Sequence, residues 1–269
     1  DDAPYVRMGF TGSKNKIKIR HPNAPGYTEV EAAPQDIYYD YQSTTTSNRV
    51  DRNVYIYTAY TEVTDYVRQY GLGNYTVADL LTEDGNGGAL GYFGCWGMVV
   101  VYENSKMKWR DITLFDGFAN VSQDNPQEDI SISGFKTVQV GDVHVKLGMM
   151  AAEGDRGISG DGCAIEKHAG GYKTLGHPNP TSNTNNFFNS SIETGGNYRY
   201  PNYVNNTGID IAMFNIDNPD NTVIGNEQTE TSFRFTTVSN RVNASGHDQY
   251  HPFCFVMGVD AYIPEAEAL

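Results

Sequence analysis

The sequence predicts an all-β protein, a β-sandwich or jelly-roll-like fold with one short helix and one long surface loop. Apolar and polar residues alternate with a period of two in many short segments, as they do in strands with one buried face. The chain of 269 residues holds 28 glycines and 11 prolines, which favour turns between such strands. It also holds 19 tyrosines, an aromatic type enriched in strands.

The alternating segments predict roughly nine or ten strands. The segment Trp96–Tyr102 is continuously apolar, so we expect a central strand that is covered on both faces. The alternating segments are, in chain order, Lys16–Arg20, Val54–Tyr57, Ile112–Phe118, Ile130–Phe135, Val143–Ala151, Ile209–Met213, Phe233–Thr237 and Phe253–Val259.

One short helix is predicted between the early strands. Val63, Val67 and Tyr70 recur at helical spacing, and Gly71 is placed to end the helix with a positive φ. The long surface loop is predicted over Lys173–Asn206, where the pattern is least regular.

Within this loop, Phe187 and Phe188 are expected to hold the segment down by burying both rings. The domain organisation predicted from these patterns has three parts. Residues 1–15 form an N-terminal extension that can exchange a strand, residues 16–264 a single β-sandwich domain, and residues 265–269 a C-terminal tail.

The net charge of -14 argues against nucleic-acid binding, because so acidic a chain repels phosphates. No apolar run approaches the ~20 residues that span a bilayer. Cys95, Cys163 and Cys254 are too few for a disulfide scaffold, and their spacing leaves any pairing open. Five sequons are candidate glycosylation sites: Asn74, Asn120, Asn189, Asn205 and Asn243.

Several collinear motifs between about Lys16 and Pro264 resemble an extracellular β-domain. That domain occurs in large bacterial and archaeal surface proteins, beside adhesin-type repeats and isopeptide-forming fimbrial domains. The resemblance implies a non-catalytic module at the cell surface. The motifs are Glu62–Val67, Gly73–Asp79, Trp96–Glu103, Arg110–Phe118, Ser133–Phe135, Glu153–Gly157, Asn185–Ser191, Pro201–Tyr203, Gly208–Asp210 and His251–Pro252.

The chain departs from this family at its N-terminus, where relatives usually carry more strand-forming sequence before Lys16. A sheet without that strand leaves unpaired backbone groups at its edge. We therefore expect a strand from a neighbouring subunit to fill the edge, or the Tyr5–Phe10 segment to fill the same edge in the next copy. The candidate assembly residues are Tyr5, Val6, Met8 and Phe10.

No cofactor is required by the sequence, but one loop could bind calcium. Glu153, Asp155 and Asp161 place carboxylates beside glycines, and hard oxygen ligands on a tight loop suit Ca²⁺. The competing interpretation is structural: Arg156 bridges Glu153 or Asp161 and fixes the loop. His247 and His251 have the spacing of a helical zinc pair, but Gly246 and Pro252 flank them, so we expect no zinc site.

Three functions follow as hypotheses. The leading one is a self-assembling filament, sheath or layer subunit at the cell surface, joined by β-strand pairing to copies of itself or to other surface proteins. The second is a monomeric adhesin or carbohydrate-binding module, with or without a dependence on calcium. The third, a polysaccharide-active enzyme, lacks an identifiable carboxylate pair, and we expect no catalytic residues.

Overall fold

The computed structural model describes residues 13–44, 52–82, 92–177, 184–195, 199–238 and 247–262. The chain divides into two compact units, of which the first ends at Met98 and the second begins at Val99. The predicted single domain over residues 16–264 spans both units and stays a prediction.

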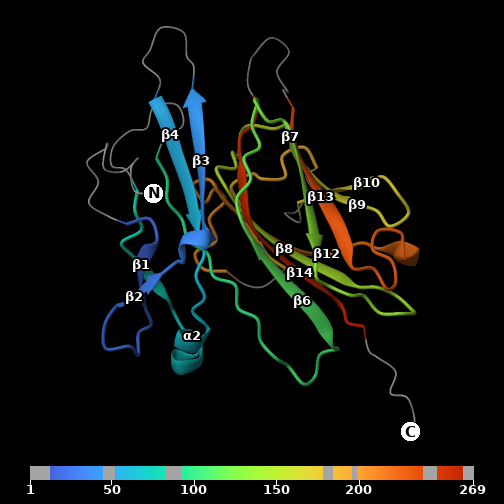
Figure 1. The fold of residues 1–269 in the computed structure, drawn as a ribbon, viewed down its shortest axis with the longest axis horizontal. Helices are drawn as coiled ribbons and strands as arrows, with labels where there is room; N and C mark the ends of the chain where they lie inside the picture. Colours follow the sequence, from blue (N-terminus) through green and yellow to red (C-terminus); the bar gives the residue numbers. More distant parts are fainter. Residues whose placement is uncertain are drawn as a thin grey trace. The chain divides into compact units, whose positions relative to one another are not determined.

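The first unit contains a three-stranded antiparallel sheet and a hairpin (Figure 1). Alternation places Ile19 in the interior, whereas Lys16 pairs with Glu29 at 3.0 Å and Lys18 with Asp79 at 2.7 Å on the accessible face. The sheet has the order β2 (Thr28–Glu31), β1 (Lys16–Arg20) and β5 (Thr76–Ala78). The 3₁₀ turn η1 (Pro34–Asp36) precedes the hairpin of β3 (Ile37–Thr44) and β4 (Arg52–Ala59).

The predicted helix is confirmed as α2 (Thr64–Tyr70). It ends at Gly71, whose φ is 71° and whose N–H donates to the carbonyl oxygen of Val67 at 2.7 Å. The Tyr66 hydroxyl accepts a hydrogen bond from the backbone N–H of His21 at 3.0 Å, which ties the helix to the end of β1.

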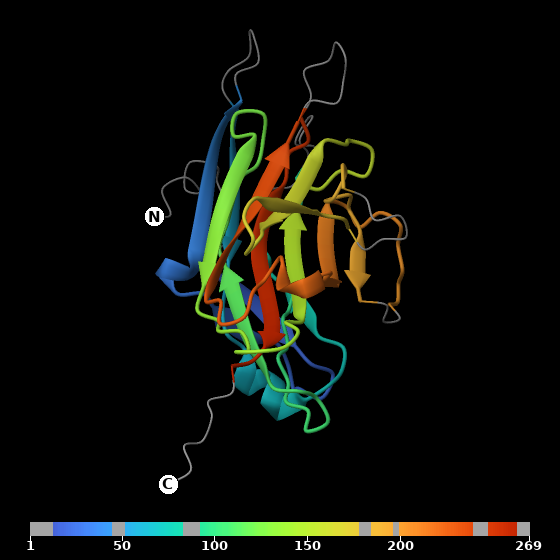
Figure 2. The same cartoon turned by 90° about the vertical axis from the view of Figure 1, so that its right-hand side faces the viewer.

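The second unit is a β-sandwich, which confirms the predicted fold class (Figure 1; Figure 2 gives the view turned by 90°, with β14 in red). One sheet has the order β10 (Tyr172–Leu175), β9 (Asp161–Glu166), β13 (Glu230–Thr237) and β7 (Gln127–Ser133). The other has the order β11 (Ile192–Thr194), β12 (Ile209–Ile216), β8 (Val145–Ala152), β14 (His251–Asp260) and β6 (Arg110–Asp116). The 3₁₀ turn η2 (Pro219–Asn221) follows β12.

Aromatic side chains from both sheets fill the interior of the sandwich. Phe233 of β13 stacks on Phe255 of β14 with ring centroids 5.8 Å apart. Phe187 and Phe188 are fully buried, and Phe188 stacks on Tyr250 at 4.5 Å. The prediction that these two phenylalanines hold their segment against the core is therefore confirmed.

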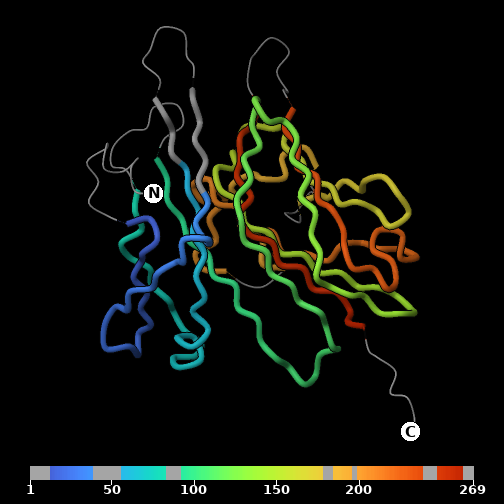
Figure 3. The backbone as a smooth tube through the Cα atoms, viewed as in Figure 1, coloured from blue at the N-terminus to red at the C-terminus, as the bar shows by residue number. Residues whose placement is uncertain are grey.

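The predicted central strand over Trp96–Tyr102 is wrong. The structure has no strand between Tyr92 and Trp109, and Val100, Val101 and Tyr102 are exposed. Figure 3 follows the second part of this run, in green, through a reversal into β6. The backbone turns back at Asn104, whose carbonyl oxygen accepts the N–H of Met107 at 2.9 Å.

The structure also corrects the predicted long surface loop over Lys173–Asn206. Its described parts contain most of β10 at one end and the parallel edge strand β11 near the other. Asp161, expected in a loop, is the first residue of β9. Strands β2, β3 and β5 were also not predicted, because their segments are short or lack clear alternation.

Candidate functional site

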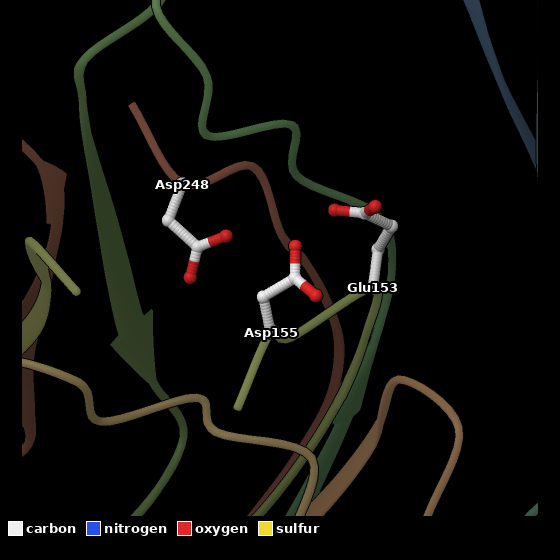
Figure 4. Close-up of side chains that lie close together, drawn as sticks. All are labelled: Glu153, Asp155 and Asp248. Carbon is white, nitrogen blue, oxygen red and sulfur yellow. The ribbon is translucent and has the colours of Figure 1, made fainter. Parts of the chain in front are cut away.

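Three carboxylates converge at one end of the second unit. They belong to Glu153, Asp155 and Asp248, and one oxygen from each lies within 4.8 Å of the others. In Figure 4 the carboxylates of Asp155 and Asp248 face each other, with that of Glu153 beside them. We call these three residues the acidic cluster.

The pairing of β8 with β14 brings the cluster together. Ala152, the last residue of β8, is the register partner of His251, the first residue of β14. Because the strands are antiparallel, the residues after Ala152 and those before His251 emerge at the same end of the sheet. Glu153 then turns the chain with a φ of 71°, which begins the loop that carries Asp155.

Asp248 is the most enclosed member of the cluster. Only 1% of its surface is exposed. One carboxylate oxygen accepts the backbone N–H of Gln249 at 3.0 Å, whereas the other oxygen, Oδ2, is buried without a hydrogen-bond partner. Burial of an unpartnered carboxylate oxygen costs on the order of several kcal/mol unless a proton, a cation or a hydrogen-bond donor compensates it.

The electrostatics of the cluster favour protonation or a cation. Burial, with the nearby charge of Asp155, raises the pKa of Glu153 to about 8. Burial, with the charges of Asp161, Asp155 and Glu153, raises the pKa of Asp248 to about 9. Burial also raises the pKa of Asp155.

No basic side chain neutralises this charge among the described residues. Arg156, expected to bridge Glu153 or Asp161, instead donates to the carbonyl oxygen of Val204 at 2.6 Å. None of the ion pairs in the described parts of the chain includes a member of the cluster. The structural interpretation, an arginine bridge, is therefore not what this loop forms.

Two further buried aspartates have a different role. Asp161 accepts the N–H of Phe188 at 2.6 Å, and Asp210 accepts the N–H groups of Ser190 and Ser191 at 3.1 and 3.0 Å. These hydrogen bonds fix the backbone from Phe188 to Ser191. Asp161 is thus not one of the three grouped carboxylates, although its charge raises the pKa of Asp248 and its Oδ1 is buried without a partner.

The sequence predicted Glu153 and Asp155 as metal ligands but did not indicate Asp248. Asp248 lies between His247 and His251. The spacing of these histidines is that of a helical zinc pair, so the pattern indicated the imidazoles and not the carboxylate. Neither histidine is on a helix: the ring of His247 lies 3.3 Å from the carbonyl oxygen of Thr237, and His251 is buried in β14. An antiparallel pairing of the last strand with Val143–Ala151 is the signal that could have found Asp248.

A second feature of this unit is an exposed apolar segment, Val99–Ile112, which we call the apolar run. Val101 is 58% exposed, Tyr102 76% and Trp109 78%, and Met107 and Ile112 are also exposed. The run leads into β6, which is the end strand of its sheet. No strand of the described residues pairs with the outer side of β6.

The remaining candidate residues are placed as follows. Asn74 is exposed, whereas Asn120 is half-buried. Asn189 uses its side-chain amide to donate to the carbonyl oxygen of Asn186 at 3.1 Å, and the Asn205 side chain accepts from Ser190. Asn243 and the assembly candidates Tyr5, Val6, Met8 and Phe10 lie outside the described residues.

The three cysteines form no disulfide. Cys163 and Cys254 are buried and Cys95 is half-buried. Burial raises the pKa of Cys95 to about 12 and that of Cys254 to about 11, so both thiols are protonated at neutral pH. No helix in the described parts of the chain is both long and apolar enough to cross a membrane.

No protein-family model matches the chain, and no curated protein sequence matches it. Among solved structures, it is similar to the infectious bursal disease virus Gx strain structure, with 11% identity over 92% of this chain and 58% of that chain, at a TM-score of 0.33. It is also similar to the VP2 subviral particle of the same virus, with 12% identity over 93% of this chain and 58% of that chain, at a TM-score of 0.34. The chain spans less than two thirds of these proteins, and TM-scores this low carry no argument about function.

Proposed function

We propose that this protein is a non-enzymatic structural subunit that assembles with copies of itself, and that it works outside the cell or at its surface. The observation that carries the proposal is the apolar run beside the unpaired side of β6. The extracellular location is supported by the resemblance of the collinear motifs and by the sequons.

The first residues of the apolar run have the composition of a strand, but they pair with no strand of the described residues. Val99, Val100 and Val101 are β-branched, and such residues fit a pleated, half-buried surface. Large exposed apolar patches on folded proteins mark interaction sites more often than chance. In this proposal a second copy covers the run and extends the sheet at β6.

The charge of the run favours another copy of this chain as the partner. Lys106, Lys108 and Arg110 follow one another at alternate positions, with no acidic residue between them. The chain as a whole has a net charge of -14. Arg110 lies 3.7 Å from Asp260. Lys106 and Lys108, by contrast, form no ion pair among the described residues and can attract acidic side chains of another copy.

The test is a pair of charge insertions followed by sedimentation velocity and negative-stain microscopy. Val101→Asp places a charge in the centre of the proposed interface, and we expect the association constant to fall at least about tenfold, or ~1.4 kcal/mol. Val140→Asp is the matched control, because Val140 is 82% exposed in the same unit but outside the run.

A protein that stays monomeric at every concentration contradicts the proposal. So does an equal loss of association in both variants. A monomer that binds a glycan or host protein would support the adhesin hypothesis instead.

A further inference from the structure

We propose that Glu153, Asp155 and Asp248 form a Ca²⁺-binding site in the second unit. This site is independent of the proposed assembly, because it lies in the loop after β8 and the segment before β14, and not in the apolar run. It is also different from the loop site expected from the sequence, since Asp248 takes the place of Asp161.

The geometry fits one ion between the three side chains. Their nearest oxygens lie within 4.8 Å of one another. Ca–O bonds are about 2.3–2.6 Å long, so oxygens on opposite sides of a calcium ion are separated by about that distance. Mg²⁺ requires shorter bonds of about 2.0–2.1 Å in a near-ideal octahedron, which three side chains from two separate segments do not pre-form.

Independent evidence for a ligand comes from the buried oxygen of Asp248. Its Oδ2 has no hydrogen-bond partner although the residue is almost fully enclosed. Asp210 shows how this protein satisfies a buried carboxylate, since its two oxygens accept the backbone N–H groups of Ser190 and Ser191. Among the described residues, no N–H group donates to Oδ2 of Asp248, and its carboxylate faces Asp155 in Figure 4.

The donor set selects the class of ion. All three groups are carboxylates, and hard oxygen ligands suit calcium or magnesium better than zinc or copper, which favour nitrogen and sulfur. Calcium binds about six to eight oxygens, so waters and carbonyl oxygens of the loop would complete its coordination shell. A divalent ion would also relieve the repulsion between three carboxylates that no basic side chain of the described residues offsets.

The test combines calorimetric titration with thermal unfolding of the full chain after treatment with a chelator. We expect wild-type protein to bind one Ca²⁺ per chain and its Tm to rise by about 5 °C in excess calcium. MgCl₂ at the same concentration should raise the Tm much less, and NaCl at equal ionic strength should leave it unchanged.

Three variants make the test specific. Asp248→Asn and Glu153→Gln should each weaken calcium binding at least about tenfold and remove most of the Tm shift. Asp124→Asn removes one charge from an exposed loop of the same unit and should keep the full shift. In chelator, Asp248→Asn should unfold at or above the wild-type temperature, because a buried amide needs neither a cation nor a proton to offset a charge beside Glu153 and Asp155.

Absence of a calcium-dependent shift in the wild type overturns the proposal. An equal shift in the wild type, Asp248→Asn and Glu153→Gln overturns it as well. If Asp248→Asn fails to fold, Glu153→Gln decides, since Glu153 is only half-buried.

Discussion

Two histidines, His177 and His251, are completely buried in the second unit, and burial favours the neutral form of both rings. Burial lowers the pKa of His177 to about 4 and that of His251 to about 4. In the unfolded chain a histidine titrates near 6.5. Because the folded-state pKa is depressed, the stability from each neutral ring is present above about pH 6.5 and is lost as the pH falls towards about 4.

His177 provides a direct test of this pH dependence. His177→Gln cannot be protonated, so its free energy of unfolding should fall less steeply than that of the wild type over this window. Between about pH 6.5 and about pH 4, the free energy of unfolding of the wild type should fall by on the order of 3 kcal/mol more than that of the variant. Denaturant unfolding at a series of pH values measures it.

His168→Gln serves as the control, because the side chain of His168 is exposed in the same unit. Identical slopes for the wild type and His177→Gln would contradict the prediction.

At the same scale, the sequence predicted only part of the acidic cluster. Glu153 and Asp155 are neighbours in the chain, so local composition revealed them. Asp248 joins them only through the register of β8 and β14, and a strand register between distant segments is not visible in local composition.

Single elements show where pattern analysis succeeds. The alternating segments became β1, β4, β6, β7, β8, β12, β13 and β14, because alternation reports directly that one face is buried. The strand predicted over Trp96–Tyr102 is absent, because a continuous apolar segment has the same composition whether it lies in the core or on the surface. Strand β9 was missed because Gly160 and Gly162 flank its first residue and resemble a turn.

Helix α2 provides a prediction at the level of one element. Gly71 ends the helix with φ 71° and ψ -151°, a region that is essentially restricted to glycine. A Cβ atom at this position would meet no neighbouring atom within 4 Å, so any cost of substitution is backbone strain alone. Gly71→Ala should therefore lower the free energy of unfolding of the first unit by about 1–3 kcal/mol.

Gly26→Ala is the matched control for this strain. Gly26 also has free space around its Cβ position but lacks the positive φ, so its substitution should change the stability by less than about 0.5 kcal/mol. Thermal unfolding followed by circular dichroism compares the two variants. Equal stability of Gly71→Ala and the wild type would show that the helix can end without this conformation.

At the scale of the whole molecule, net charge and local charge act in opposite directions. Copies that each have a net charge of -14 repel one another, whereas Lys106 and Lys108 in the apolar run attract the acidic surface of a neighbour. Replacing both lysines by glutamate changes the net charge to -14 - 4 = -18. We expect association to weaken by several-fold or more.

The same change of net charge outside the apolar run separates the repulsion due to net charge from the local attraction by Lys106 and Lys108. The double variant Lys146→Glu and Lys167→Glu also reaches -14 - 4 = -18 but leaves the apolar run intact. It should weaken association much less, as measured by sedimentation equilibrium at fixed ionic strength. Equal weakening in both double variants would mean that only the overall charge matters.

The position of β14 has a consequence for how the second unit folds during synthesis. This strand comes last in the chain order of strands, yet it lies between β8 and β6 and pairs with both. Cys254, for example, pairs with Asp116, a separation of 254 - 116 = 138 residues. Contacts this distant slow folding. During synthesis, β6 and β8 must therefore wait with open edges until β14 leaves the ribosome, an interval in which chaperones would protect them from pairing with the wrong chain.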